Sequence, residues 1–114
     1  MPTDFQDILY DKQNNVAVVT MNRPQVLNAF RPRTIDEMRA AFQDAWDDSD
    51  IGVVVLTGAK GNFCVGGDVK VRGEGGYDDE GGGPRLQVTH LHRIIREIPK
   101  PVIAMVDGYA IGGG

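Results

Sequence analysis

Two glycine-bearing segments, each preceded by a short apolar run, constrain the fold of this chain more than any other feature. Residues 63–68 read FCVGGD and residues 108–114 read GYAIGGG. Apolar runs of this kind are typical of strands, so each segment is predicted to be a turn at the end of a strand. Two such turns can direct two backbone N–H groups at one point. A carbonyl oxygen that gains negative charge during a reaction needs that arrangement.

Strand patterns alternate with helix patterns along the rest of the chain. Helices are predicted over residues 34–48 and 86–98, where apolar residues recur at spacings of three and four. The remaining predicted elements are a hairpin with strands 5–10 and 16–21 around a turn at 11–15, and two strands of the buried type at 51–56 and 102–106. This alternation predicts an α/β fold with a mainly parallel sheet. Ligands of such sheets bind at the carboxyl ends of strands, where both glycine segments lie.

Local signals mark where the predicted elements begin and end. Thr34 and Glu37 form a capping-box pattern, which predicts that Thr34 is the N-cap of the first helix. Pro24 ends the strand before it, because proline lacks the backbone donor of a strand ladder. Residues 73–83 hold six glycines and four acids and are expected to form a mobile loop.

Composition argues against several classes of protein. The chain has 114 residues, a net charge of −4 and no basic block, so nucleic acid is not an expected partner. No apolar run approaches the roughly 20 residues of a membrane span, and the first residues lack the features of a signal peptide. Cys64 is the single cysteine and can form no internal disulfide, which fits a reducing compartment. A cytoplasmic protein that does not bind membranes is expected.

The remaining chemically active residues predict neither a metal site nor a nucleotide site. His90 and His92 are two apart and cannot share a helix face, and no further histidine or cysteine completes a ligand set. The glycine-rich stretch lacks both nucleotide-binding fingerprints. Cys64 has no activating base nearby in the sequence, so a small buried side chain is expected there. Asp68 is expected to hold the N–H groups of its own loop instead of acting as a base.

Several motifs, in their order and spacing, resemble the crotonase (enoyl-CoA hydratase/isomerase) superfamily. They are NRP at 22–24, NAF at 28–30, FCVGGD at 63–68, PKPVIA at 99–104 and GYAIGGG at 108–114. The resemblance implies an α/β fold of the crotonase type (the ClpP/crotonase spiral of ββα units). It also implies that residues 1–114 are the N-terminal part of a single domain that ends inside the second glycine turn. Such a piece is expected to be inactive by itself.

Within the superfamily the chain most resembles the naphthoate synthases. These lyases close the ring of o-succinylbenzoyl-CoA to give 1,4-dihydroxy-2-naphthoyl-CoA in menaquinone biosynthesis. The resemblance rests on KVRG at 70–73, GGY at 75–77 and PRL at 84–86, all after the first glycine pair. Two positions depart from the synthase pattern. Leu27 replaces an arginine that helps to hold the CoA part of the substrate, and Val69 replaces a glutamine.

The resemblance implies a role for both glycine turns and for one tyrosine. Gly67 and Gly113 would donate their backbone N–H groups to the enolate oxygen of a CoA thioester. Tyr77 would donate a hydrogen bond near the reacting centre, which a phenol with a pKa of about 10 can do without ionising. The residues expected to contact the substrate are Val65, Gly66, Gly67, Asp68, Val69, Tyr77, Tyr109, Ala110, Ile111, Gly112 and Gly113.

The resemblance also implies which other molecules take part. The substrate is an acyl-CoA, CoA enters only as part of it, and no cofactor is tightly bound. The general base is either bicarbonate or an acidic side chain placed by residues beyond Gly114. Members of the superfamily assemble as trimers or hexamers, so a homotrimer or homohexamer is expected.

Other interpretations of the same residues stay open. The motifs also fit an enoyl-CoA hydratase/isomerase or an enzyme similar to 2-ketocyclohexanecarboxyl-CoA hydrolase. Some crotonase-fold proteins bind a ligand or serve as scaffolds without turnover, and the departures at Leu27 and Val69 would suit such a protein. Without the resemblance, the glycine pairs are ordinary tight turns, and Tyr77 is an exposed aromatic residue beside three acids.

Overall fold

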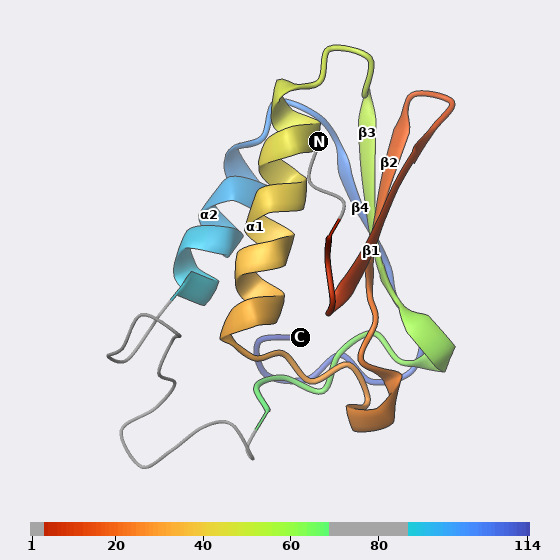
Figure 1. The fold of residues 1–114 in the computed structure, drawn as a ribbon, viewed down its shortest axis with the longest axis vertical. Coiled ribbons are helices and arrows are strands. Elements are labelled where there is room, and N and C mark those ends of the chain that lie inside the picture. The colour runs from red at the N-terminus through yellow and green to blue at the C-terminus, as the bar shows by residue number, and fades with distance from the viewer. Residues whose placement is uncertain (1–3, 69–86) are drawn as a thin grey trace.

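The computed structural model describes residues 4–68 and 87–114. These residues form two layers, a twisted four-stranded sheet and two α-helices that lie together on one side of it (Figure 1). The elements in chain order are β1 (Ile8–Gln13), β2 (Val16–Met21), the 3₁₀ turn η1 (Pro24–Val26), α1 (Pro32–Asp47), β3 (Val53–Gly58), the 3₁₀ turn η2 (Ala59–Gly61), α2 (Gln87–Glu97) and β4 (Val102–Met105). The predicted alternation of strands and helices is therefore confirmed.

The sheet has the order β1-β2-β3-β4. β1 pairs antiparallel with β2, whereas β2 with β3 and β3 with β4 pair in parallel. Helix α1 lies in the connection from β2 to β3, and α2 lies in the connection from β3 to β4. Parallel pairs need such crossover connections. The mainly parallel sheet is confirmed, and its three parallel strands end at one edge, from which the loops after β2, β3 and β4 extend.

The first strand lies three residues later in the chain than the sequence predicted. It is β1 instead of residues 5–10, and the hairpin turn consists of Asn14 and Asn15 alone. Both asparagines have positive φ values, 53° and 68°, which suit a two-residue hairpin turn. The polar end of the strand misled the prediction. Lys12 pairs in the ladder, and its ammonium group forms an ion pair of 2.9 Å with Asp44 of α1.

The hydrophobic core lies between the sheet and the helices. It consists of alternate residues of the central strands and of one face of each helix. Among its buried members are Ala17, Val19, Met21, Met38, Ala41, Phe42, Ala45, Val54, Leu56, Leu91, Ile94 and Ile98. The period of two on the strands and of three to four on the helices matches the sequence pattern that predicted them.

The last two strands are less buried than predicted. Val54 and Leu56 of β3 are buried, but the residues between and beside them are half-buried. β4 is an edge strand of the described sheet, and its Ile103 and Met105 are 53% and 57% exposed. An apolar, β-branched run correctly predicts a strand. It does not specify what packs on the second face, and the described residues leave that face partly exposed.

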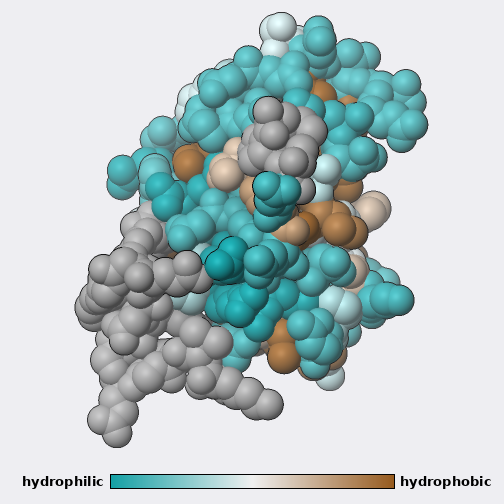
Figure 2. Space-filling model, in the orientation of Figure 1, coloured by the Kyte–Doolittle hydropathy of each residue, from teal (hydrophilic) through white to brown (hydrophobic). Residues whose placement is uncertain are grey.

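Exposed apolar side chains concentrate near the second glycine segment. The face shown in Figure 2 is mostly hydrophilic, with its apolar residues in small separate patches. The exposed large apolar residues of the described structure are Leu9, Leu27, Ile103, Met105, Val106, Tyr109 and Ile111. Five of these seven lie within residues 103–111, so β4 and the loop after it carry most of the exposed apolar surface.

Helix α1 begins earlier than the capping-box pattern predicted. It begins at Pro32 with Arg31 as N-cap, so Thr34 is its third residue. The Thr34 hydroxyl accepts a hydrogen bond from the Arg31 N–H at 3.1 Å and donates one to the Asp7 carboxylate at 2.7 Å. The Glu37 carboxylate accepts the Asp7 N–H at 2.7 Å. The prediction failed because both side chains bind the segment before β1, a contact that local spacing does not reveal.

Asp7 is the buried centre of this contact. The Arg31 guanidinium donates two hydrogen bonds to its carboxylate, each 2.7 Å long. Burial would raise the pKa of Asp7, but the hydrogen bonds from Arg31 and Thr34 outweigh it and hold the pKa below its ordinary value. The ionised carboxylate therefore fastens the segment before β1 to the start of α1.

Replacing this carboxylate tests its contribution to stability. Asp7→Asn is expected to lower the free energy of unfolding by about 2 kcal/mol at neutral pH, since Arg31 loses its charge partner while remaining partly exposed. Because the folded-state pKa of Asp7 is depressed, the wild-type contribution is complete above about pH 5 and is lost as the pH falls through that pKa. Urea unfolding of both proteins over this pH range measures the effect. An identical loss of stability with falling pH in both proteins would contradict it.

Candidate functional site

The two glycine segments lie against one another. Cys64 and Ala110 form an isolated parallel bridge: the Cys64 N–H donates to the Tyr109 carbonyl at 2.8 Å, and the Ile111 N–H donates to the Cys64 carbonyl at 3.0 Å. A Cβ atom built on Gly66 would lie 3.1 Å from the Ile111 carbonyl oxygen. The segments therefore meet after two parallel strands, as their positions in the sequence predict.

Gly67 is flanked by two hydrogen bonds to Phe30. The Phe30 N–H donates to the Gly66 carbonyl at 2.9 Å, and the Asp68 N–H donates to the Phe30 carbonyl at 2.7 Å. In a parallel pairing of this kind, the residue between the two bonded peptide groups turns its own N–H and carbonyl to the opposite side. The Gly67 N–H therefore points away from the Phe30 backbone.

The ring of Phe30 lies against Gly113 in the second segment. A Cβ atom on Gly113 would be 2.8 Å from Phe30 Cζ and 2.9 Å from Phe30 Cε2, which is closer than such carbons can approach. Glycine is required at this position by the close approach of the ring. Phe30 thus contacts both segments, the first through its backbone and the second through its side chain.

The structure brings together most of the residues expected to contact the substrate. Those described are Val65, Gly66, Gly67, Asp68, Tyr109, Ala110, Ile111, Gly112 and Gly113. Gly66 and Asp68 are buried, whereas residues 109–113 are exposed. Tyr77 and Val69 lie outside the described residues, as does the loop expected at 73–83. Their predicted roles stay predictions.

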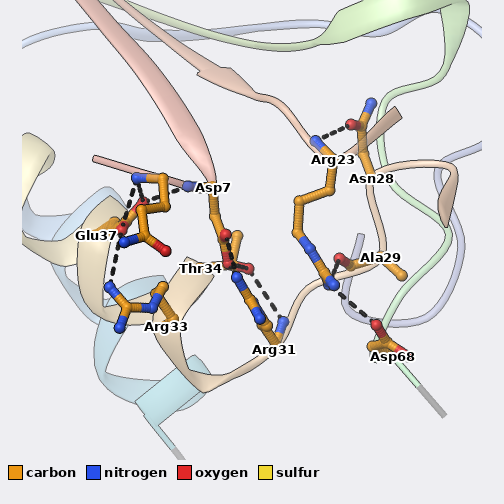
Figure 3. Close-up of polar contacts among 10 residues, drawn as sticks. Asp7, Arg23, Asn28, Ala29, Arg31, Arg33, Thr34, Glu37 and Asp68 are labelled. Atoms are coloured by element: carbon orange, nitrogen blue, oxygen red, sulfur yellow. Dashed lines mark hydrogen bonds and ion pairs between the residues drawn. The ribbon is translucent and has the colours of Figure 1, made fainter. Parts of the chain in front are cut away.

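Asp68, at the end of the first segment, forms a buried ion pair with Arg23 (Figure 3). Arg23 Nη1 lies 3.1 Å from Asp68 Oδ2, and the same nitrogen donates a hydrogen bond to the Ala29 carbonyl at 2.6 Å. This partner of Asp68 lies in the loop after β2 and was not singled out from the sequence. The one signal for it is an arginine between the end of a strand and Pro24, which by itself is too common to indicate a buried pair.

Asn28 is a second buried polar residue that sequence reasoning missed. It is 1% exposed and has a φ of 58°. Its side-chain oxygen accepts the Arg23 N–H at 2.8 Å, and its amide nitrogen donates to the carbonyls of Ala59 and Asn62 at 2.9 and 2.7 Å. Asn28 therefore ties the loop after β2 to the loop after β3, directly before the first glycine segment.

Cys64 is a buried structural residue, as predicted. It is 1% exposed, and its Sγ accepts the Gly66 N–H at 3.4 Å. Burial raises the pKa of the thiol above its ordinary value, although contacts with the backbone of Gly66 and Phe30 oppose the shift. Little thiolate is present at neutral pH, so the geometry does not suit a nucleophile.

A cavity of about 250 Å³ lies between the sheet and the helices, beside the second glycine turn. Gly113 and Gly114 border it, together with Phe30 and Cys64. The other lining residues are mainly apolar and come from all the parallel strands and both helices: Met21, Ile35, Met38, Leu56, Phe63, Val88, Leu91, His92, Ile95 and Ala104. A space lined in this way suits the apolar part of a ligand.

Residues 4–68 and 87–114 contain no group of three or more histidine, cysteine or acidic side chains that could hold a metal ion. Neither α1 nor α2, the helices of this described part, is long and apolar enough to cross a bilayer.

The contact between the two segments can be tested through two glycines that both have positive φ. Gly66 has a φ of 99° and little space for a Cβ, whereas Gly112 has a φ of 60° and no described atom within 4 Å of that position. Gly112→Ala is expected to lower the free energy of unfolding by about 1 kcal/mol through backbone strain alone. Gly66→Ala should cost at least about 1 kcal/mol more because of overpacking. Denaturant titration measures both, and equal losses would contradict the close contact.

The burial of Cys64 predicts slow reaction with thiol reagents in the folded protein. Alkylation with iodoacetamide, followed by peptide mapping, should leave Cys64 unmodified under native conditions and modify it rapidly in urea. The reason is that the thiol is both inaccessible and largely protonated. Rapid modification of the folded protein would show an accessible thiolate and reopen a catalytic role for this residue.

Comparisons with known proteins show the family and the fold of this chain. A sequence model of the family described as enoyl-CoA hydratase/isomerase matches residues 11–114. An enoyl-CoA hydratase/isomerase from Marinobacter aquaeolei has 34% identity and a TM-score of 0.80, over 95% of this chain and 44% of that one. An enoyl-CoA hydratase from Mycobacterium avium subsp. paratuberculosis has 27% identity and a TM-score of 0.78, over 94% and 41%.

A protein of Pseudomonas aeruginosa has 28% identity and a TM-score of 0.83, over 99% of this chain and 49% of its own. The chain therefore spans less than half the length of each of these three structures. The family match extends over nearly all of the chain, and the fold agrees with it at TM-scores near 0.8. The chain has the crotonase fold and belongs to the enoyl-CoA hydratase/isomerase family.

Proposed function

We propose that the intact protein is an enzyme that acts on a CoA thioester and stabilises its enolate with the N–H groups of Gly67 and Gly113. The observation that carries this proposal is the contact between the two glycine segments through Phe30. Its backbone turns the Gly67 N–H away from itself, and its ring packs on Gly113.

For the proposed enolate chemistry, this part of the protein needs to supply little more than the N–H groups of Gly67 and Gly113. Removal of a proton next to the thioester carbonyl places negative charge on the carbonyl oxygen. Fixed N–H groups stabilise that charge without having to reorganise, and one such donor is worth about 3 kcal/mol in the transition state. Glycine suits both positions, since a side chain would obstruct the approach of the thioester.

The surroundings of the two turns support an acyl-CoA substrate. The cavity of about 250 Å³ beside Gly113 and Gly114 is lined mainly by hydrocarbon groups, which suits the acyl portion. Tyr109 and Ile111 are about half exposed and extend the apolar surface around the second turn. CoA itself enters as part of the substrate, and no separate cofactor is proposed.

For the specific reaction, we propose ring closure of o-succinylbenzoyl-CoA by a naphthoate synthase mechanism. Support comes from the sequence motifs that follow the first glycine pair, above all GGY at 75–77. Tyr77 would donate a hydrogen bond to an oxygen of the reacting centre. The base is bicarbonate or an acidic side chain outside residues 1–114.

A second candidate is hydration or isomerisation of an enoyl-CoA. The solved structures from Marinobacter aquaeolei and Mycobacterium avium carry these activities in their names. The departures at Leu27 and Val69 weaken the match to the synthase pattern without pointing to either reaction. Leu27 is 42% exposed and has a left-handed backbone with a φ of 54°, a strained state for leucine.

One assay separates these possibilities. The full-length protein is incubated with o-succinylbenzoyl-CoA, with and without bicarbonate, and in parallel with crotonyl-CoA and water. Formation of the dihydroxynaphthoyl-CoA chromophore supports the synthase, and formation of 3-hydroxybutyryl-CoA supports the hydratase. Tight binding of both thioesters without any product would favour a non-catalytic binding or scaffold protein.

Tyr77→Phe distinguishes the synthase role of this tyrosine from an exposed loop residue. The change removes one hydrogen-bond donor and keeps the ring. In the full-length enzyme we expect kcat for ring closure to fall at least roughly 10-fold while KM changes little, because the bond forms chiefly in the transition state. Unchanged kcat would end the proposal for Tyr77 without affecting the roles of Gly67 and Gly113.

A further inference from the structure

Arg23 and Asp68 form a buried charged pair that the proposed chemistry does not use. They are 9% and 6% exposed, and they are held together at 3.1 Å between the loop after β2 and the end of the first glycine segment. Removing two charges from water is costly, and their attraction often does no more than balance that cost. A pair of this kind is better explained by the geometry that it fixes than by stability alone.

The Arg23–Asp68 ion pair lies beside the backbone hydrogen bonds between Phe30 and the first glycine segment. The Phe30 N–H and carbonyl bond to Gly66 and Asp68, one residue on either side of Gly67. Arg23 adds a third connection at the same place, because its Nη1 contacts Asp68 Oδ2 and also donates to the carbonyl of Ala29, the residue before Phe30. Arg23 Nη1 therefore contacts both segments of the short parallel bridge between Phe30 and Gly67.

Arg23 is itself held from the other side by Asn28. The Arg23 N–H donates to Asn28 Oδ1 at 2.8 Å, and the Asn28 N–H donates to the Arg23 carbonyl at 2.9 Å (Figure 3). Asn28 Nδ2 in turn bonds to the carbonyls of Ala59 and Asn62. Through these bonds the backbone of Arg23 is held to the loop that leads into the first glycine segment.

From this geometry we infer that the Arg23–Asp68 pair positions the Gly67 N–H, so that Arg23 and Asp68 are positioning residues for the enolate site. The inference rests on the proposed function of Gly67. A backbone donor stabilises an oxyanion only if its direction is fixed before the reaction. Two backbone hydrogen bonds to Phe30, one on each side of Gly67, limit where Gly67 lies, and the ion pair holds the residue that follows it.

The test compares Asp68→Asn with Asp7→Asn in the full-length protein. Both changes are nearly isosteric, and each removes the charge of a buried carboxylate that pairs with an arginine: Arg23, which is largely buried, or Arg31, which is partly exposed. Asp68→Asn is expected to lower kcat for the acyl-CoA substrate roughly 100-fold with little change in KM, the effect of a misplaced catalytic group. Asp7→Asn is expected to lower stability while kcat stays near the wild-type value. Equal effects of the two variants on kcat would overturn the inference.

A second measurement does not depend on turnover. In protein labelled with ¹⁵N-glycine, Asp68→Asn should speed hydrogen exchange of the Gly67 amide and move its resonance, whereas Asp7→Asn should do neither. An unchanged Gly67 amide in Asp68→Asn overturns the positioning role even if the wild type turns over no thioester. An inactive wild type whose Gly67 amide responds to Asp68→Asn alone would refute the proposed function and support the positioning role.

Arg23→Lys serves as the milder variant if Asp68→Asn does not fold. Lysine keeps the charge but lacks the planar fork, so it cannot hold the Asp68 carboxylate and the Ala29 carbonyl with the same geometry. The kcat of Arg23→Lys is expected to lie between that of the wild type and that of Asp68→Asn. Hydrogen exchange of the Gly67 amide should change in the same direction as in Asp68→Asn. Wild-type kcat together with an unchanged Gly67 amide in this variant would also overturn the inference.

Discussion

The two glycine turns depend on one aromatic residue at the carboxyl edge of the sheet. The backbone of Phe30 brackets Gly67, and its ring occupies the space that a side chain on Gly113 would need. The backbone hydrogen bonds between Cys64 and residues 109 and 111 hold the two turns together directly, and the Phe30 ring adds a side-chain contact. The sheet supplies the framework for this contact, since its parallel strands deliver both turns to the same edge.

Buried polar groups surround this contact and connect the loops that carry it. Asn28 joins the loop after β2 to the loop after β3. The Arg23–Asp68 pair joins the loop after β2 to the first glycine segment. Asp7 pairs with Arg31 at the start of α1. Such groups stabilise a fold only modestly, because their desolvation offsets much of their attraction. These groups chiefly fix the orientation of the loops, since hydrogen bonds and ion pairs are more directional than apolar contacts.

The proposed function asks backbone groups, and not reactive side chains, to stabilise the enolate. The described site holds no cluster of metal ligands, and its one cysteine is buried with a raised pKa. In the proposed function, it supplies the backbone N–H groups of Gly67 and Gly113 beside the mainly apolar cavity. Membership of the enoyl-CoA hydratase/isomerase family is consistent with such a site. The proposed choice among ring closure, hydration and isomerisation depends on residues other than these two glycines, and the sequence motifs propose Tyr77 as one of them.

Sequence alone determined the order of strands and helices, the mainly parallel sheet and the meeting of residues 63–68 with 108–114, because periodicity and glycine placement are local signals. It misplaced β1 and the start of α1, since Lys12, Thr34 and Glu37 bind partners about thirty residues away. Only the tertiary structure decided that β4 is exposed and that Arg23 and Asn28 hold the first turn. Long-range pairing of buried polar groups leaves no periodic trace in a sequence, because it depends on which loops the fold brings together.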